Sequence, residues 1–529
     1  MCGIAVAIDW EGAQTAVAIM TGGIDHRGDI TDPMVSPRAN TAMSTRRLRI
    51  VDADHASQPQ PSFDNRLLVS FNGEIYNHAE LRHELSALGV PFRTQSDTEV
   101  VANALQVWGA GALRRFNGMF AFVAFDLGSG EFLAARDPFG VKPLYVVQSA
   151  TGFLFCSEIK PLLAASESGD VMLLPPGYLL TRKVCAKYKS AIEAPPAGTS
   201  DGNDQLFDDI MAKAVQSRVP ADLPFAVQLS GGIDSTLIAH YAREIRPDVP
   251  CYFLGNPDVP DYRYARDYAD MTGADFRVVP FNAQGAETLA SLPDVVAATE
   301  SFEPNVIQGA VCSYFAAQAI HKDGFRVALC GEGADELFCG YLPLEVGFVH
   351  GEEIGRAVRQ DTLNMMARTC LQRIDRAPMH FQLEVREPFL DPAVVNYALG
   401  LKGPAMFETV GGTRRGKKPL RALYDLHTDK LPQSIRHRSK VAFDAGVGLR
   451  EVSAESAWRD HFEQAISDAD FRDGQREFAA YDLRTKEELF YLRHLAATMD
   501  VSRVPHLKDR TRLVVPFSVP GMENLRKVA

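Results

Sequence analysis

Short apolar runs separated by turns fill the first 180 residues of the chain, a pattern that predicts a sheet-rich region. Within this region, residues 77–88 carry leucines at helical spacing and are predicted to form one amphipathic helix. The four apolar runs of strand length are residues 1–8, 66–75, 119–127 and 152–159.

The pattern changes after residue 182. Residues 183–204 are rich in proline, glycine and serine and carry little apolar periodicity, so they are expected to form a linker. From residue 205 to residue 529 the chain follows the order helix, strand, glycine-rich turn, helix, with a second strand and turn at 325–336. This order predicts a doubly wound, parallel α/β sheet with added helices, and residues 1–182 are expected to form a separate domain.

Composition narrows the classes of function. Among the 529 residues, 46% are apolar and 23% are charged, as in globular proteins, and the net charge of -12 argues against nonspecific nucleic-acid binding. We find neither an apolar run of 18 residues nor a basic leader, so we expect a cytoplasmic protein that does not bind membranes. The eight cysteines lack the spacing of zinc ligands.

Cys2 is the first candidate for chemistry. Removal of Met1 would expose its α-amino group, which can act as the base for its own thiol. The thiolate could then attack the amide carbon of glutamine and release ammonia. On its position alone, Cys2 is more simply explained as an accidental cysteine.

Other residues of the same region strengthen the first interpretation. Asn72 and Gly73 follow an apolar strand, where a side-chain amide and a backbone N–H can form an oxyanion hole. Arg47 can hold the α-carboxylate of an amino acid, and Asp97 can pair with its α-ammonium group. Each feature alone is weak, because Asn-Gly is usually a turn and charged residues usually face solvent.

Seven segments together resemble the glutaminase domain of the class II glutamine amidotransferases: MCGIAVAI, RRLRIVD, FNGEIYN, SDTEV, RDPFGVKPLY, FCSEIK and LPPG. The resemblance implies a four-layer αββα fold, Cys2 as the nucleophile, and Asn72 with Gly73 as the oxyanion hole. The residues implied to hold glutamine are Arg47, Ile50, Val51, Asn72, Gly73, Glu74 and Asp97. Residues 26–29 lack the proline that many relatives have, and Ser44-Thr45 stands where Gly-His often precedes the double arginine.

The turn SGGIDS, residues 230–235, lies between a predicted strand and a predicted helix, so its amides can face a phosphate group. It is similar to the pyrophosphate-binding loop of the ATP pyrophosphatases, whereas the GxxxxGK[ST] loop of kinases is absent. The resemblance implies that a carboxylate attacks the α-phosphate of ATP, that pyrophosphate leaves, and that ammonia then displaces AMP. Asp234 could hold a magnesium ion that bridges the phosphates.

A second turn, CGEGADE at residues 330–336, resembles a segment of the glutamine-hydrolysing asparagine synthetases, and LEVREPFLD and RSKVAFDAGVG extend the resemblance over most of the chain. The family implies Asp335 as a second Mg²⁺ ligand and Lys440 as a catalytic cation, with Lys417 and Arg421 as further candidates. It also implies a homodimer. The implied ATP-binding residues are Leu229, Ser230, Gly231, Gly232, Asp234, Ser235, Leu254, Cys330, Gly331 and Glu332.

The acid that receives the ammonia is the open question. The family implies aspartate, activated as β-aspartyl-AMP, and an internal tunnel for ammonia. Residues 300–308 lie where bacterial asparagine synthetases read ETYDVTTIR; Glu300 matches as a catalytic acid or base, but Gln308 replaces an arginine. Glu387 replaces a valine in REPFLD. Two alternatives therefore stay open: amidation of another carboxylic acid in specialised biosynthesis, and a noncatalytic regulatory binding protein.

Overall fold

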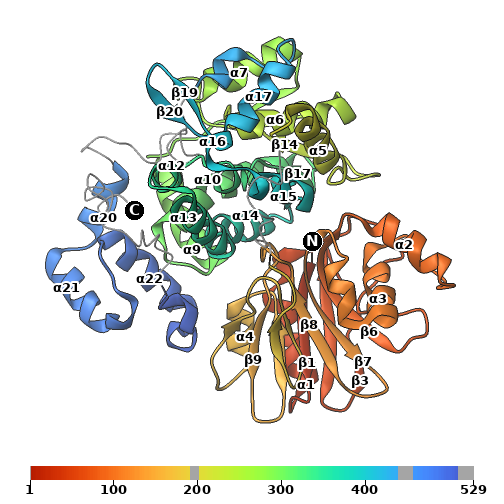
Figure 1. Ribbon diagram of the computed structural model, residues 1–529. Coiled ribbons are helices and arrows are strands. Elements are labelled where there is room, and N and C mark those ends of the chain that lie inside the picture. Colours follow the sequence, from red (N-terminus) through yellow and green to blue (C-terminus); the bar gives the residue numbers. More distant parts are fainter. Residues whose placement is uncertain (1, 191–201, 439–456, 510–529) are drawn as a thin grey trace.

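The computed structural model describes residues 2–190, 202–438 and 457–509 (Figure 1). In its amino-terminal part, two antiparallel sheets pack face to face between helices. The first sheet contains β11 (Met172–Leu173), β9 (Tyr145–Gln148), β10 (Phe153–Cys156), β1 (Cys2–Ile8), β4 (Thr41–Arg47) and β2 (Ile30–Thr31), in that order, with β3 (Val35–Arg38) paired to β4. The second contains β13 (Cys185–Lys187), β12 (Tyr178–Leu180), β8 (Phe132–Arg136), β7 (Gly118–Asp126), β6 (Leu67–Ile75) and β5 (Gln60–Pro61).

Helices cover both outer faces of this pair of sheets. α1 (Ala13–Gly23) and α4 (Ile159–Ala165) lie on the first sheet, and α2 (His78–Ala87) and α3 (Asp97–Trp108) lie on the second (Figure 1). Since the sheets form inner layers, their central strands are apolar on both faces, and every residue of β1 is buried. The αββα arrangement expected from the resemblance is confirmed.

The carboxyl-terminal part is built on a five-stranded sheet in which all strands run parallel. Its order is β16 (Phe276–Val279), β15 (Cys251–Leu254), β14 (Ala226–Gln228), β17 (Val327–Leu329) and β18 (Glu384–Arg386). From β14 the chain moves outward to β15 and β16, then returns to the other side of β14 as β17. The point between β14 and β17 is therefore the topological switch point, where ligands of such sheets bind.

Helices surround the parallel sheet, and a short hairpin of β19 (Glu408–Val410) and β20 (Thr413–Arg415) lies beside it. Between residues 204 and 350 the helices are α5 (Asp204–Gln216), α6 (Ile233–Ile245), α7 (Tyr262–Thr272), α8 (Ala286–Ala290), α9 (Leu292–Thr299), α10 (Pro304–Lys322), α11 (Ala334–Leu337) and α12 (Leu342–Val349). From residue 352 to residue 436 they are α13 (Glu352–Met365), α14 (Cys370–Met379), α15 (Pro392–Gly400), α16 (Gly403–Met406), α17 (Lys418–Leu426) and α18 (Gln433–Arg436).

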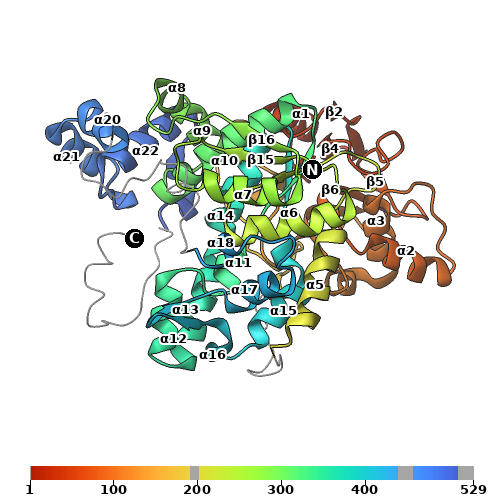
Figure 2. The same ribbon diagram turned by 90° about the horizontal axis from the view of Figure 1, so that it is seen from above.

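Three later helices, α20 (Ala457–Ala465), α21 (Asp468–Glu477) and α22 (Lys486–Thr498), lie at the opposite end of the molecule from α2 and α3 in both views (Figures 1 and 2). α22 packs on α9. The segment after α22 returns to the amino-terminal part, where the backbone N–H of Val171 donates to the carbonyl of Arg503 at 2.8 Å.

The two-part α/β fold class predicted from the sequence is confirmed. One strand differs from the expected organisation, because β13 lies inside the segment 183–204 expected to be a linker and pairs with β12. Residues 191–201 of that segment lie outside the described residues. Among the described helices, none combines the length and the apolar character needed to cross a membrane.

Candidate functional site

Cys2 is the first residue of β1 and is 6% exposed. Its backbone N–H donates to Oδ1 of Asn72 at 2.9 Å, and Nε2 of Gln58 lies 3.8 Å from its sulfur. Burial raises the pKa of the Cys2 thiol to about 11, although a hydrogen bond from the Leu48 backbone and the Arg47 guanidinium oppose this rise. The thiol therefore needs a nearby base to become a nucleophile at neutral pH.

Asn72 and Gly73 lie side by side on β6, next to Cys2. Within the described residues, the buried Nδ2 of Asn72 has no hydrogen-bond partner, so it is a donor available to a ligand. Gly73 has a φ of 150°, and a Cβ there would lie 2.0 Å from the carbonyl oxygen of Met119. Only glycine fits this position, which keeps the backbone of β6 close to β7.

Arg47 lies opposite Cys2 in the register of β1 and β4. Its guanidinium makes a two-point contact with Asp32, with Nε–Oδ2 at 2.9 Å and Nη2–Oδ1 at 3.2 Å, and its Nη1 donates to the carbonyl of Ala53 at 2.9 Å. Asp32 therefore occupies one edge of the guanidinium. A substrate carboxylate would meet the remaining Nη1 and Nη2 hydrogens.

Glu74 and Asp97 complete this group. Oδ2 of Asp97 accepts from the backbone N–H of Ile75 at 3.0 Å. Glu74 pairs with Arg386 of β18, with Oε1 and Nη2 3.1 Å apart, and burial raises the pKa of Glu74 to about 8 against the opposing charge of Arg386. The parallel sheet thus supplies a direct partner to the predicted glutamine site.

Ile50 and Val51 follow β4 in the chain, shortly after Arg47. Ile50 is buried, and Val51 is half-buried and packs against the same apolar cluster. The structure therefore brings Cys2 together with Arg47 and Asn72, and Gly73, Glu74 and Asp97 lie on or beside the strand that carries Asn72.

The turn after β14 leads into α6 as expected for a phosphate-binding loop. The Ser235 hydroxyl accepts from the backbone N–H of Ser230 at 3.1 Å and lies 2.9 Å from the Ser230 hydroxyl. Gly231 has a φ of 72°, and a Cβ there would lie 2.6 Å from the carbonyl oxygen of Asp261. Among the residues that the structure describes, no side chain caps α6, so its first amides can serve an anion.

The second turn follows β17, on the other side of the switch point. A Cβ at Gly331 would lie 2.9 Å from both Cβ of Asp234 and the backbone nitrogen of Ser235, so the two turns are in contact. Cys330 is buried at the end of the strand, and Glu332 is 20% exposed. The two predicted ATP-binding segments therefore form one site. Leu229 and Leu254 are buried near the ends of β14 and β15.

Lys417 connects the two predicted metal ligands. Its Nζ lies 2.6 Å from Oδ2 of Asp234 and 2.5 Å from Oδ1 of Asp335, and Lys417 is 3% exposed. Its φ of 62° is unusual for lysine. A Cβ at Gly340 would lie 2.5 Å from Cε of Lys417 and 1.8 Å from Oδ1 of Asp335, so glycine permits this close approach.

This pair of carboxylates fits a magnesium ion bound together with phosphate. Both oxygens converge on one cationic point, and Mg²⁺ typically takes one or two carboxylates plus phosphate oxygens of the substrate. The described residues contain no cluster of three or more His, Cys, Asp or Glu side chains suited to a metal. Lys440 lies outside the described residues.

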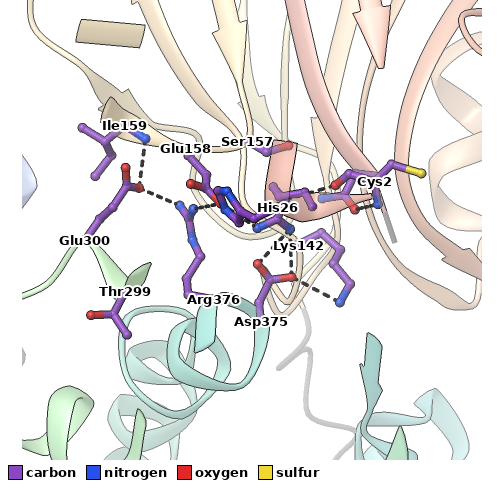
Figure 3. A network of polar contacts seen from close by, with 12 residues as sticks. Cys2, His26, Lys142, Ser157, Glu158, Ile159, Thr299, Glu300, Asp375 and Arg376 are labelled. Atoms are coloured by element: carbon purple, nitrogen blue, oxygen red, sulfur yellow. Dashed lines mark hydrogen bonds and ion pairs between the residues drawn. The ribbon is translucent and has the colours of Figure 1, made fainter. Parts of the chain in front are cut away.

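Glu300 contacts the amino-terminal part of the chain. It follows α9 with a φ of 51°, is fully buried, and accepts from the backbone N–H of Ile159 at 2.9 Å (Figure 3). It also accepts from the backbone N–H of Lys160 at 2.8 Å. Its Oε2 also lies 3.1 Å from Nη2 of Arg376 in α14. Glu300 thus binds the start of α4, a helix of the amino-terminal part.

Arg376 continues this contact into a buried network of charges (Figure 3). Its Nη1 lies 3.0 Å from Oε1 of Glu158, which also contacts His26 Nε2 at 2.8 Å and Arg27 Nη1 at 3.0 Å. Burial alone would raise the pKa of Glu158, but His26 and Arg376 hold it well below its usual range. Residues 26–29, which lack the proline found in many relatives, therefore still contribute to the contact between the amino-terminal part and α14.

Arg27 links this network to the nucleophile. Its Nε donates to the carbonyl of Cys2 at 3.2 Å, and its Nη2 lies 3.0 Å from Oδ2 of Asp375. Lys142 lies 3.4 Å from Oδ1 of the same carboxylate. A continuous series of polar contacts therefore runs from Cys2 to Glu300.

Gln308 is turned toward the carboxyl-terminal helices. Its Nε2 donates to Oε1 of Glu487 at 2.9 Å, and the same oxygen accepts from Trp458 Nε1 at 3.1 Å and the Tyr491 hydroxyl at 2.9 Å. Asn305 is exposed and Val306 is buried. The segment that differs from the bacterial pattern is thus tied to α20 and α22.

Sequence reasoning assigned no role to several residues of these sites. Asp32, Gln58 and Arg386 lie beside the predicted glutamine site, and Arg27 and Glu158 join the two parts. Arg27, Glu158 and Arg386 lie inside or beside segments that carry the resemblance, but nothing in the residue types indicates their partners. Asp32 and Gln58 lie outside the segments that carry the resemblance, so nothing in the sequence indicated a role for them.

Comparisons with known proteins cover both parts of the chain. Residues 1–174 match the family described as "Glutamine amidotransferase domain", and residues 206–346 and 348–513 match the family "Asparagine synthase". A "Probable asparagine synthetase [glutamine-hydrolyzing]" of Schizosaccharomyces pombe is 31% identical, over 94% of this chain and 93% of that protein. Similar proteins from Dictyostelium discoideum (29% identical, 86% and 85% covered) and Arabidopsis thaliana (28% identical, 93% and 85% covered) carry the names "Probable asparagine synthetase [glutamine-hydrolyzing]" and "Asparagine synthetase [glutamine-hydrolyzing] 1".

Proposed function

The chain belongs to the asparagine synthase family, and from that premise we propose that it transfers the amide nitrogen of glutamine to the β-carboxylate of aspartate. It is an ATP-dependent carbon–nitrogen ligase of the glutamine-hydrolysing type. The products are asparagine, glutamate, AMP and pyrophosphate. The substrate assignment, the residue roles and the route of ammonia are our proposals.

In the first reaction, the α-amine of Cys2, freed by removal of Met1, takes the thiol proton. The sulfur attacks the amide carbon of glutamine, and the amide oxygen becomes an oxyanion. The Nδ2 of Asn72, which has no partner among the described residues, and the backbone N–H of Gly73 are the proposed donors to it. The C–N bond breaks, ammonia leaves with the proton from the amine, and water hydrolyses the thioester to glutamate.

In the second reaction, an oxygen of the aspartate β-carboxylate attacks the α-phosphorus of ATP, and the bond to pyrophosphate breaks. The first amides of α6 and the Ser230 and Ser235 hydroxyls hold the phosphate groups. Asp234 and Asp335 would hold Mg²⁺, which neutralises phosphate charge when bound. Lys417 then turns from the carboxylates to the phosphates, and Lys440 is proposed to act as a second cation. Ammonia attacks the acyl carbon, the nitrogen gives its extra proton to the departing phosphate group, and AMP leaves.

One observation supports the transfer of ammonia from the first reaction to the second. Leu48, Ile50, Met119 and Val141, from the amino-terminal part, belong to the same buried apolar cluster as Leu229, which directly precedes the phosphate-binding loop. Neutral ammonia crosses apolar surroundings, whereas water would protonate it. We therefore propose that ammonia moves through this cluster.

The organisation expected from the sequence belongs to the same proposal. The glutaminase domain is residues 1–182, the linker is 183–204, and the synthetase domain is 205–529. A homodimer and a cytoplasmic location stay predictions.

A second candidate is amidation of a different carboxylic acid by the same chemistry. It is favoured by Gln308, which replaces an arginine and donates to Glu487. If the missing arginine contacts the substrate in relatives, its loss should weaken aspartate binding. A noncatalytic role is disfavoured, because Cys2, Asn72 and the SGGIDS loop are all present.

The product profile of the purified protein tests the proposal. The protein is incubated with glutamine, ATP, Mg²⁺ and aspartate, and asparagine, glutamate, AMP and pyrophosphate are quantified. We expect equal amounts of asparagine, AMP and pyrophosphate. Glutamate formation without asparagine would reject aspartate and favour the second candidate.

A further inference from the structure

Arg373 of α14 lies between the amino-terminal part of α10 and the second turn of the parallel sheet. Its Nη2 is 2.5 Å from Oε1 of Glu332. A Cβ at Gly309 would lie 2.7 Å from Cδ of Arg373 and 2.9 Å from its Nε and Nη1. Glycine at 309 therefore lets the guanidinium lie directly against the backbone of α10. This places a cation beside the segment 300–308 and beside the ATP-binding turn.

The guanidinium retains hydrogens for a ligand. Within the described part of the chain, its side-chain hydrogen bonding is to Glu332, and its buried Nε has no partner. The side chain is 19% exposed, so a small molecule can reach it. An arginine with free N–H groups beside a reaction site is suited to a carboxylate, which it can bind at two points.

Gln308 has a partner in the carboxyl-terminal helices. Its side chain donates to Glu487, which places it among the carboxyl-terminal helices. The positive charge next to Glu332 comes from Arg373, on a different helix.

We propose that Arg373 binds the carboxylate of the acid substrate that is not amidated, which for aspartate is the α-carboxylate. This inference rests on the proposed function and specifies its substrate class, an acid with a second anionic group. Glu332 holds one edge of the guanidinium and fixes its direction. Monocarboxylic acids of similar size would lack this contact.

The test compares kinetic constants for asparagine formation, with glutamine as the nitrogen donor, in the parent protein and the Arg373→Gln variant. We expect the KM for aspartate to rise about 10- to 100-fold, which is the size of one charged hydrogen bond. The KM for ATP and the glutaminase rate should stay within about twofold. With β-alanine, which lacks the α-carboxylate, AMP formation should be weak in the parent and no weaker in the variant. Arg472→Gln, at an exposed arginine of α21, is the matched control.

Gly309→Ala is a second variant that keeps the positive charge and moves it. The added Cβ pushes the guanidinium away from α10, so the KM for aspartate should again rise while glutaminase activity is retained. Gly22→Ala is its control, because a Cβ at Gly22 has no atom within 4 Å. This pair keeps the test decisive if Arg373→Gln does not fold.

The outcomes separate the inference from the function on which it rests. If the parent makes asparagine and both variants keep its KM for aspartate, Arg373 does not bind the substrate and the proposed function stands. A rise in the KM for ATP alone would assign Arg373 to phosphate and overturn the inference. If the parent makes no asparagine from aspartate, the proposed function and the inference both fall.

Discussion

The ammonium group of Lys417 lies 2.6 Å from a carboxylate oxygen of Asp234, although 183 residues separate them in the sequence. Asp335 contacts the same ammonium at 2.5 Å. The lysine therefore balances two carboxylates proposed to bind Mg²⁺. It also ties the segment before α17 to both turns at the switch point.

Lys417→Ala should abolish amide synthesis while sparing glutamine hydrolysis. Removing the ammonium takes away a cation that contacts two buried carboxylates, at a cost of about 3 kcal/mol in the free energy of unfolding. Asparagine formation should fall at least about 100-fold. Mg²⁺ should raise the melting temperature of the variant more than that of the parent, because it replaces the lost cation. Lys418→Ala, at the exposed neighbouring lysine, is the control. Full synthetase activity in Lys417→Ala would reject this role.

Asn72→Ala should remove an oxyanion donor from the glutaminase site. We expect glutamine hydrolysis to slow about 100- to 1000-fold, as measured by glutamate release. Asparagine formation from added ammonium salt should be unchanged, since the second site is intact. Asn40→Ala, at an exposed asparagine of the same domain, should behave like the parent. An equal loss with glutamine and with ammonium would contradict the assignment of Asn72 to the first site.

Glu300→Gln distinguishes a catalytic role from a role at the interface. Both carboxylate oxygens of Glu300 accept backbone N–H groups of α4, and Oε2 also pairs with Arg376. We therefore expect the variant to uncouple the reactions, with fewer asparagines formed per glutamate released. Its ammonium-dependent kcat should stay within about tenfold of the parent. A loss of about 100-fold or more in that kcat would instead support the acid–base role inferred from the resemblance.

Glu387 should make stability depend on pH. Burial raises its pKa to about 8 against the opposing charges of Lys142 and Arg218, so the folded protein holds a proton that the unfolded chain releases near pH 4.5. The stabilisation by this proton is fully present below the unfolded pKa of 4.5 and is lost as the pH rises through the folded pKa of about 8. The free energy of unfolding should fall by up to about 5 kcal/mol over this range.

The Glu387→Val variant, which restores the residue more usual in the family, checks this effect. Its melting temperature should exceed that of the parent by more at pH 8.5 than at pH 5.5. Glu353→Gln, at an exposed glutamate of α13, should show no such difference. Equal differences at the two pH values would mean that Glu387 is not protonated in the folded protein.

Much of the fold follows from local patterns. The apolar runs at 1–8 and 66–75 become β1 and β6, and the predicted helix at 77–88 becomes α2 (His78–Ala87). Periodicity succeeds here because the buried face of each element appears in its own sequence as a regular pattern of apolar residues. It missed β13, which is short and lies on the outer edge of its sheet, where burial imposes no apolar pattern.

The sequence predicted which residues belong to the candidate sites, but it did not predict which residues they contact. The motifs placed Cys2 with Asn72, because both occur in segments of the resemblance. No local pattern indicates that Glu300 meets α4, 141 residues earlier, or that Arg386 pairs with Glu74. A charged residue in a sequence reveals its chemistry, whereas its partner depends on how distant elements pack.

The central claim is that nitrogen released at Cys2 reaches the second site without entering solvent. The most direct measurement uses glutamine labelled with ¹⁵N in its amide, together with ATP, Mg²⁺, aspartate and unlabelled ammonium chloride at a concentration equal to that of glutamine. Mass spectrometry then gives the ¹⁵N content of the asparagine amide. The account predicts that nearly all of this nitrogen is ¹⁵N. Label diluted to the composition of the ammonium in solution would contradict it.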